Sequence, residues 1–544
     1  MLAQRMRLFP ATMCCAILKL WGESMNDEKI TAVQTHNLTK TFDEVVACDD
    51  ISFDVRKGEI LALLGENGSG KTTLMNMLSG IYFPNSGWIE VFGKKVSIRT
   101  PKDAFDLGIG MVHQHFKLVD LFTATENVIL GLDEGKLVNR KAKAKEIQEI
   151  SKRYGFELDP DKKIYNMSVS EKQTVEIVKV LYRGAEILIL DEPTAVLTPQ
   201  ETERLFETMR NMRADGKAIV IITHKLNEVL SVSDRVHVLR KGKSIATVNT
   251  SETNYQELTD MMVGRAVSLK IDRPEPENKT DRLFVKNITC MTPDAVAALN
   301  DVSFTLKAGE ILGVAGIAGS GQKELCEAIA GLHPIHGGSI KYINEKDENV
   351  ELVGMSAREI LAQGVKFAFV PEDRLGMGLV ANMDMTDNVM LRYYYKNKTP
   401  FADRKSSRKL ATGLIEQLQI VTPGVSTPVR RLSGGNIQKV LLGREISSAP
   451  RVLAVAYPVR GLDINSSYTI YDLLNKQKQN DVAVLFVGED LDVLLELADR
   501  ILVLCGGQVS GIVNAREVTK EQVGLLMTHV PEKIETYEEV SESE

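Results

Sequence analysis

The chain has 544 residues, of which 44% are hydrophobic and 26% charged, and its formal net charge is −7. This length predicts more than one domain, either three or four of ordinary size or two larger α/β units. The acidic balance and the absence of a basic block argue against a nucleic-acid partner. The six cysteines form no C-x-x-C pair and suggest no disulfide framework, which fits a reducing cytosol.

Residues 1–24 are interpreted as an N-terminal extension. Their longest uncharged run, Leu8–Leu18, is interrupted by a proline and is far shorter than the ~20 residues that span a bilayer. Arginines precede this run as in a signal peptide, but no small-x-small cleavage site follows. Because Met25 opens a polar stretch that leads into strand-like sequence, a misassigned upstream start is an equally open interpretation.

The first motif follows short strands expected within residues 30–60. An aliphatic run ends at Leu64, and Gly65–Thr72 then reads G-x-x-x-x-G-K-T. Glycines let backbone N–H groups approach a phosphate, Lys71 reaches the terminal phosphates, and the Thr72 hydroxyl can hold Mg²⁺. The helix expected at Thr73–Ser79 directs its positive N-terminal end at the anion.

A chance Gly-rich turn of this pattern is the alternative, and it is expected in roughly a few per cent of chains of this length. The preceding strand and following helix favour a nucleotide site. The ATP-binding residues predicted here are Gly65, Glu66, Asn67, Gly68, Ser69, Gly70, Lys71, Thr72 and Thr73.

Further along the chain, the pattern alternates between strands and helices. A strand pair is expected around residues 88–96, and helical periodicity with a charged, solvated face runs from Thr123 to Tyr165. Apolar runs at 186–190 and 217–222 predict two buried strands. Each of them is followed by residues able to do chemistry.

Asp191 and Glu192 end the first of these strands. A hydrolase needs one carboxylate to hold Mg²⁺ and a second to polarise the attacking water, and this pair could do both. A plain strand-end turn is the alternative. Gln114 could contact the γ-phosphate or Mg²⁺, and His224 could contact the γ-phosphate or steady the base. Phe42 could stack on adenine, although core packing explains it nearly as well.

The whole order then recurs, which identifies two copies of one unit. The stretch ISFDVRKGEIL at 51–61 matches VSFTLKAGEIL at 302–312, and Gly65 matches Gly316 at the same spacing of 251 residues. Asp191 matches Ala456 and His224 matches Glu489, both at a spacing of 265 residues. The second copy therefore carries small insertions and is otherwise colinear.

The second copy departs from the first at the places that carry chemistry. Gln322 stands where Lys71 does in the first copy, and Lys323 stands where a hydroxyl should be. Ala456 and Tyr457 replace both carboxylates, and Glu372 replaces the glutamine. We expect no fast hydrolysis at this copy's own phosphate loop.

Taken together, GENGSGKT, Gln114, ILILDEPT, His224 and the segment LSGGNIQK at 432–439 resemble the ATP-binding cassette (ABC) ATPases. The resemblance covers nearly all of residues 30–530. It implies an α/β fold with two tandem P-loop ATPase domains, each a mixed sheet core with an antiparallel β part and a helical signature subdomain. It also implies that Ser433, Gly434 and Gly435 close on the γ-phosphate of ATP held by the opposite cassette.

The resulting domain prediction divides the chain into five parts. They are an N-terminal extension at 1–24, a first ATPase domain at 25–264, a linker at 265–282, a second ATPase domain at 283–529, and an acidic tail at 530–544 that we expect to be disordered.

The first copy has the intact phosphate loop, whereas the second copy has the intact signature segment. The second copy keeps its LSGG segment, whereas the first copy reads MSVSEKQ, with Ser170 in place of the second glycine. Head-to-tail pairing, as in ABC cassettes, would give one composite site that is sound throughout and one that is defective throughout. A merely decayed second copy does not explain why its signature is kept.

Tandem cassettes of this kind resemble importer ATPases for simple sugars and nucleosides, and MVHQHFKLVDLFTATENVILG and FVPEDRLGMGLV are similar to the nucleoside-uptake branch. The resemblance implies ATP hydrolysis, ATP and Mg²⁺ as cofactors, and a place on the cytoplasmic face of the membrane. It also implies two membrane permeases, docked after Gln114 and Glu372, and an extracytoplasmic binding lipoprotein. Sugar remains an alternative to nucleoside, and a twin cassette acting on ribosomes or DNA is a rival from another class.

Overall fold

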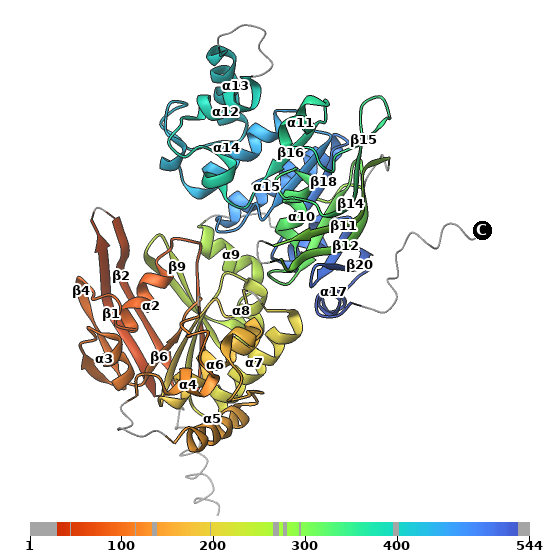
Figure 1. The fold of residues 1–544 in the computed structure, drawn as a ribbon. Coiled ribbons are helices and arrows are strands. Elements are labelled where there is room, and N and C mark those ends of the chain that lie inside the picture. The colour runs from red at the N-terminus through yellow and green to blue at the C-terminus, as the bar shows by residue number, and fades with distance from the viewer. Residues whose placement is uncertain are drawn as a thin grey trace, which may run out of the picture. The chain divides into compact units, whose positions relative to one another are not determined.

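The computed structural model describes residues 30–43, 45–114, 116–132, 139–195, 197–264, 271–275, 280–292, 295–394 and 402–530. The expectations for residues 1–24 and for the tail beyond Val530 lie outside these ranges. The chain forms two compact units, one comprising residues up to Pro193 and Phe206–Met262, the other comprising Thr194–Leu205 and the residues from Val263 on (Figure 1).

The first unit contains two sheets. An antiparallel sheet has the order β2-β1-β4-β5 and is built from β1 (Thr31–Phe42), β2 (Val45–Arg56), β4 (Ser86–Val91) and β5 (Lys94–Val96). The central sheet has the order β10-β9-β3-β8-β7-β6 and is built from β3 (Ile60–Leu64), β6 (Ile109–Val112), β7 (Ile187–Asp191), β8 (Ala218–Ile222), β9 (Arg235–Arg240) and β10 (Lys243–Asn249).

Five of the six central strands run parallel, and β10 pairs antiparallel with β9. Strands β3, β6, β7 and β8 are buried at every residue, which explains why their sequences are almost entirely apolar, the charged exception being Asp191 at the end of β7. All these parallel strands end at one edge of the sheet. The segments after β3, β6, β7 and β8 therefore meet there.

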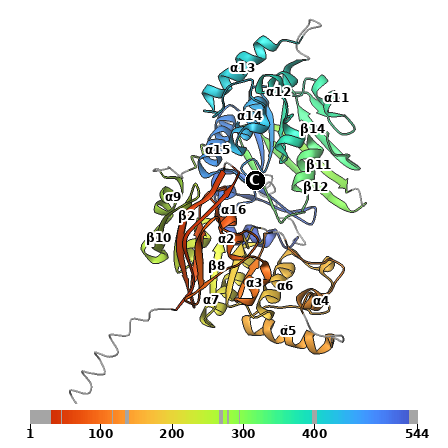
Figure 2. The same ribbon diagram turned by 90° about the vertical axis from the view of Figure 1, so that its left-hand side faces the viewer.

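The helices of the first unit cover the central sheet and form a separate subdomain. They are α2 (Lys71–Leu78), α3 (Pro101–Asp106), α4 (Ala124–Ile129), α5 (Arg140–Tyr154), η1 (Ile164–Asn166), α6 (Val169–Tyr182), α7 (Pro199–Ala214), α8 (Leu226–Val232), η2 (Thr250–Glu252) and α9 (Tyr255–Val263). The start of α7, up to Leu205, is grouped with the other unit. In Figures 1 and 2, α4, α5 and α6 gather at one end of the unit, where Val128, Ile147 and Val178 share a small core.

The predicted helical stretch from Thr123 to Tyr165 is only partly correct. Two helices, α4 and α5, lie within it, and α5 ends at Gly155, whose φ of 85° is the left-handed conformation that favours glycine. Residues 156–163 contain no helix. The helix after the phosphate loop begins at Lys71, two residues before the predicted start.

The second unit repeats this architecture. Its antiparallel sheet, β12-β11-β14-β15, consists of β11 (Asp281–Met291), β12 (Ala297–Lys307), β14 (Gly337–Ile343) and β15 (Asn349–Glu351). Its central sheet, β16-β17-β18-β13-β19-β20, consists of β13 (Ile311–Gly316), β16 (Phe367–Val370), β17 (Val452–Ala456), β18 (Ala483–Val487), β19 (Arg500–Cys505) and β20 (Gln508–Asn514). The topology is that of the first unit, so the predicted duplication and fold class are confirmed.

The helices of the second unit also match those of the first. They are α10 (Gln322–Ile329), α11 (Ala357–Ala362), the π-helical turn η3 (Arg374–Gly378), α12 (Met385–Tyr393), α13 (Arg404–Gln417), η5 (Val429–Arg431), α14 (Gly434–Ile446), α15 (Ile464–Gln479), α16 (Leu491–Leu497) and α17 (Lys520–Leu526). Within the described ranges, every helix is too short or too polar to cross a bilayer.

Part of the expected linker packs on the second unit. Ile271 is buried in its core, and Arg273 donates to the backbone oxygens of Leu495 and Ala498 at 2.9 and 2.6 Å. The chain therefore joins the second unit before β11 begins.

Candidate functional site

The phosphate loop connects β3 to α2 in the first unit. Gly68 and Gly70 have φ of 79° and 99°, and a Cβ on Gly70 would lie 2.5 Å from the backbone oxygen of Ala47. Both positions have the left-handed conformation that favours glycine, and Gly70 also turns tightly against the neighbouring strand β2. Phosphate binding by this loop stays a prediction, and the left-handed glycines give the loop the tight turn that the prediction requires.

Lys71 folds back across this loop. Its Nζ donates to the backbone oxygens of Gly65 and Glu66 at 2.6 and 2.9 Å. Burial lowers the pKa of Lys71, and the carboxylates of Glu192 and Asp191 partly oppose that shift. A buried ammonium group held by two carbonyl oxygens is suited to exchange them for phosphate oxygens.

Two hydroxyl groups complete the loop. Ser69 is buried, and within the described part of the chain its Oγ has no hydrogen-bond partner. An orphaned polar atom in a glycine cradle fits a bound phosphate oxygen. Thr72, on the first turn of α2, is exposed.

The acidic pair lies at the end of β7, beside the phosphate loop. Glu192 has φ of 46°, a strained conformation for this residue, and its N–H donates to Ile222 at 2.8 Å. Its carboxylate accepts a hydrogen bond from Gln114 Nε2 at 2.9 Å and lies 3.0 Å from His224 Nδ1. The structure thus brings together three side chains from the ends of β6, β7 and β8.

The two carboxylates differ in their protonation chemistry. The hydrogen bond with His224 holds the pKa of Glu192 below its usual range. Burial, and then the charge of Glu192, raise the pKa of Asp191 to about 6, while Lys71 opposes the shift. An ionised Glu192 can accept a proton from water, and a buried Asp191 favours a nearby cation.

Phe42 lies at the end of β1, near the loop end of the unit. Its ring meets Tyr82 edge-on at 5.1 Å between centroids, and its side chain is 39% exposed. Lys40 Nζ also lies over this ring, 5.3 Å from its centroid, so a base could stack on Phe42 only where Tyr82 and Lys40 leave the ring exposed. Tyr82 is a neighbour that the sequence did not reveal.

In the second unit, Ser433, Gly434 and Gly435 lie at the N-terminal end of α14. No side chain caps this helix, and Asn436 instead donates to Ser433 Oγ at 2.8 Å. A Cβ on Gly435 would lie 2.5 Å from Ser466 Oγ, so α14 packs closely against the start of α15. The open N–H groups suit an anion.

The corresponding helix end in the first unit, at α6, is already occupied. Ser168 and Glu171 form a capping box, with Ser168 N–H donating to Glu171 at 2.7 Å, and Lys162 pairs with the same carboxylate at 2.6 Å. A carboxylate at this position takes the place of a phosphate and repels one. The sequence analysis noted the lost glycine and missed this carboxylate cap, although Ser168 and Glu171 stand at the S-x-x-E spacing of a capping box.

The second unit keeps the backbone of the first site and changes its side chains. Tyr457 has φ of 48° and donates its N–H to Val487 at 2.9 Å, which matches Glu192. Gln322 Nε2 donates to Ile317 at 3.1 Å, much as Lys71 donates to Glu66. The second unit therefore keeps the local backbone of the first site, while Gln322 and Tyr457 stand in place of Lys71 and Glu192.

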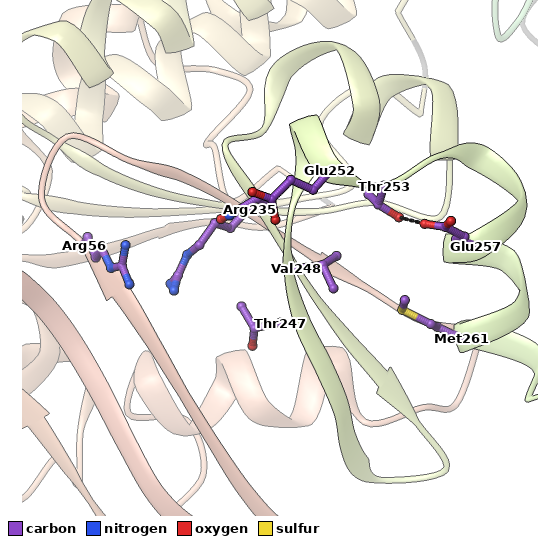
Figure 3. A pocket seen from close by; sticks show the side chains of 9 residues that line it. Arg56, Arg235, Thr247, Val248, Glu252, Thr253, Glu257 and Met261 are labelled. Carbon is purple, nitrogen blue, oxygen red and sulfur yellow. Dashed lines mark hydrogen bonds between the residues drawn. The ribbon is translucent and has the colours of Figure 1, made fainter.

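A pocket in the first unit lies away from the phosphate loop. It is bordered by β9, β10, η2 and α9, with Arg235, Thr247 and Glu252 among its lining residues (Figure 3). Arg235 is engaged by Glu59 and Asp54 at 2.6 and 2.9 Å, so its charge is already balanced. None of the predicted site residues lines this pocket.

Comparison with known proteins identifies the family. The profile described as ABC transporter matches residues 48–195 and 299–456. This chain belongs to the ABC transporter family. It is an ATP-binding, ATP-hydrolysing enzyme, as the resemblance implied.

Two curated relatives extend over almost the whole chain. The nucleoside import ATP-binding protein NupA of Lactococcus lactis subsp. cremoris is 44% identical over 502 residues, covering 91% of this chain and 98% of its own. The ribose import ATP-binding protein RbsA 1 of Streptomyces avermitilis is 38% identical over 494 residues, covering 90% and 92%.

A solved structure of two proteins also matches. It contains the archaeal ribosome recycling factor aABCE1 with the ribosomal stalk protein aP1, and it covers 88% of this chain and 90% of that chain at a TM-score of 0.57 and 18% identity. At this identity the match is informative about the fold alone.

Proposed function

We propose that this chain powers import of a small solute, with one competent ATP site per chain. The observation that carries the proposal is the network in which Gln114 and His224 both contact Glu192. Glu192 would act as the general base on the attacking water, His224 would hold its orientation, and Gln114 would report the γ-phosphate.

The phosphates of ATP would lie in the cradle from Gly65 to Thr73, with Phe42 stacked on adenine. Thr72 and Asp191, assisted by Gln114, would hold Mg²⁺, which usually takes only one or two protein ligands beside phosphate oxygens and water. Mg²⁺ would neutralise charge on the phosphates. The raised pKa of Asp191 fits a carboxylate awaiting such a cation.

The other half of the competent site would come from Ser433, Gly434 and Gly435 of the second domain. Their uncapped helix end supports this role, whereas Glu171 caps the equivalent end in the first domain. Gln322, Ala456 and Tyr457 would form the other, degenerate site with that capped end. ATP would close the halves only if it binds the closed state more tightly than the open one.

A nucleoside is the proposed solute, because NupA is named for nucleoside import and is 44% identical to this chain. Ribose or another simple sugar is the second candidate, supported by RbsA 1 at 38%. The proposed partners are two membrane permeases and an extracytoplasmic binding lipoprotein, with this subunit on the cytoplasmic face. Nucleic acid is not a proposed partner.

The competent site is tested with Glu192→Gln. The amide keeps the size of the side chain, so ATP binding should persist while turnover falls by roughly 10²–10⁴-fold. The matched variant Gln322→Lys should leave the ATPase rate unchanged, because Ala456 and Tyr457 remain. Full turnover of the first variant, or a doubled rate in the second, would contradict the proposal.

The solute is tested by reconstituting the chain with its permeases and binding protein in lipid vesicles. Uptake of a radiolabelled nucleoside, but not of ribose, is the expected result. Uptake of ribose alone would replace the nucleoside with sugar and leave the ATPase assignment intact.

A further inference from the structure

The second domain contains an ion-paired cluster at the place of the catalytic network. Arg460 Nε lies 3.0 Å from Glu489, and Arg460 Nη1 pairs with Glu372. The backbone oxygen of Arg460 also accepts a hydrogen bond from Arg374 Nη2. We call these four residues, Glu372, Arg374, Arg460 and Glu489, the Arg460 clamp.

The clamp resembles the first-domain network in that one central side chain contacts two others, but the central group is positively charged instead of negatively charged. In the first domain a carboxylate, Glu192, is the hub between Gln114 and His224. Glu372 and Glu489 occupy the positions of that glutamine and histidine in the second repeat.

The hub of the clamp is a guanidinium group. It comes from Arg460, three residues after the residue that replaces the base. Arg460 stands where the first repeat has Ala195, so the hub is new to the second domain.

The clamp holds the start of the helical subdomain. Glu372 and Arg374 both contact Arg460, and the residue between them, Asp373, is the N-cap of the π-helical turn η3. Asp373 accepts the N–H groups of Leu375 and Gly376 on its side chain and those of Met377 and Gly378 on its backbone oxygen. The backbone N–H groups of residues 375–378 therefore all donate to Asp373, which lies between Glu372 and Arg374.

The same segment reaches the signature. Arg374 Nη1 lies 3.5 Å from the position that a Cβ on Gly434 would take, and the Nε of Arg374 is buried without a hydrogen-bond partner in the described structure. Arg374 therefore connects the segment after β16, the segment after β17 and the signature helix of one domain.

We infer that Arg460 is a positioning residue that holds segment 372–379 in place without nucleotide. In the first domain the corresponding contact runs through Glu192, which ATP hydrolysis would engage at each turnover. In the second domain the clamp contains its own positive charge and needs none from Mg²⁺. This inference rests on the proposed function, in which that segment adjoins a permease, so one docking segment would follow the nucleotide while the other stays fixed.

The alternative is an ordinary exposed ion pair, which contributes little. Arg404 supplies a matched control in the same domain. It is 61% exposed and pairs with Asp384 and Asp387 at 3.4 and 2.9 Å, whereas Arg460 is 56% exposed and also pairs with two carboxylates. The two arginines are thus alike in exposure and in the number of carboxylates they pair with, and they differ in the segments that those carboxylates belong to.

The test is hydrogen exchange followed by mass spectrometry on the purified full chain. Arg460→Ala should accelerate exchange of the amides in 375–379 by roughly fivefold or more. Arg404→Ala should leave them within about twofold of wild type. If both variants behave alike, or if Arg460→Ala leaves the segment unchanged, the inference is wrong.

Two further variants keep the test decisive if Arg460→Ala folds poorly. Glu372→Gln, which breaks one arm and keeps Arg460, should also accelerate exchange in 375–379. Arg460→Lys should give an intermediate rate, because one ammonium group cannot fork to two carboxylates as a guanidinium does. Wild-type exchange in both variants would overturn the inference.

A nucleotide arm separates this inference from the proposed function. In the Glu192→Gln chain, Mg²⁺ and ATP should slow exchange of the amides in 116–122 and leave 375–379 unchanged. Slowing confined to 375–379 would overturn the clamp. No response in 116–122 would count against the competent site and leave the Arg460→Ala result to decide the clamp alone.

Discussion

His237 makes the stability of the first domain depend on pH. Its side chain is buried on β9, where Nδ1 lies 2.7 Å from Thr247 Oγ1 and Nε2 lies 3.1 Å from Ser244 Oγ. Burial, followed by the charge of Arg235, lowers the pKa of His237 to about 4, and Asp54 opposes the shift. The folded domain therefore keeps this ring neutral at pH values where the unfolded chain protonates it.

The sign and size of the effect follow from proton linkage. The unfolded histidine titrates at 6.5, so between pH 6.5 and about 4 the unfolded chain binds one more proton than the folded one. The stabilising contribution is complete above pH 6.5 and is lost as the pH falls. Between pH 7.5 and 5.0 the loss in unfolding free energy comes to about 2 kcal/mol.

The assay is urea unfolding followed by tryptophan fluorescence, in EDTA and without nucleotide. The two tryptophans, Trp21 and Trp88, both precede the second repeat, and Trp88 lies on β4 of the first domain. His36 stacks on Trp88 at 4.7 Å, and this contact is the same in wild type and in every variant compared. The quantity compared is therefore a difference between variants.

His237→Gln and His237→Asn remove the titration while each keeps one polar contact. Both should lower stability at pH 7.5, and both should lose about 2 kcal/mol less than wild type on going to pH 5.0. Equal pH dependence in wild type and both variants would refute the reasoning, because it would mean that His237 protonates freely in the folded state.

Two glycine substitutions test the backbone requirements of the proposed site. Gly70→Ala should weaken ATP binding more than tenfold and destabilise the first domain by about 1–3 kcal/mol. The control is Gly93→Ala, where φ is 72° and a Cβ would meet nothing within 4 Å, and it should not affect ATP binding. Isothermal titration calorimetry measures the binding, and urea unfolding measures the stability. Gly435→Ala should reduce turnover more than nucleotide affinity, because its Cβ would meet Ser466 and displace α14 rather than the phosphate loop. Steady-state ATPase kinetics separate the effect on kcat from the effect on KM. A loss of affinity with unchanged turnover would contradict the prediction.

Much of the fold could be predicted because its pattern is repeated. Strands β3 and β8 are aliphatic throughout and β7 is aliphatic up to Asp191, and apolar strands recur at the matching places of the second repeat. The stretch from Thr123 to Tyr165 was harder. Its charged residues form the solvated face of α5, as predicted. Gly155 is the sequence signal that marks the end of this helix, and the residues after it keep a polar composition that resembles the helix.

The predicted site residues come together because topology brings strand ends to one edge. Gln114, Glu192 and His224 could be proposed from spacing alone, and the structure gives them mutual contacts. Their roles in catalysis stay predictions. The contacts of Arg460 could not be predicted from the sequence. The matching position of the first repeat is Ala195, which lies outside the motifs and has no charged group to suggest such contacts.

The second domain replaces the side chains of the proposed catalytic network and keeps the backbone around them, and this combination argues against simple decay. Tyr457 keeps the strained φ that Glu192 has, because its N–H still pairs with the neighbouring strand. Gln322 keeps one carbonyl contact of Lys71, and Arg460 adds a hub of opposite charge. Random substitution would remove contacts without supplying new ones. The replacements instead connect the same segments through contacts within the protein that do not require a bound phosphate. Such contacts suit a second domain with a structural role, as the proposal of a single competent ATP site requires.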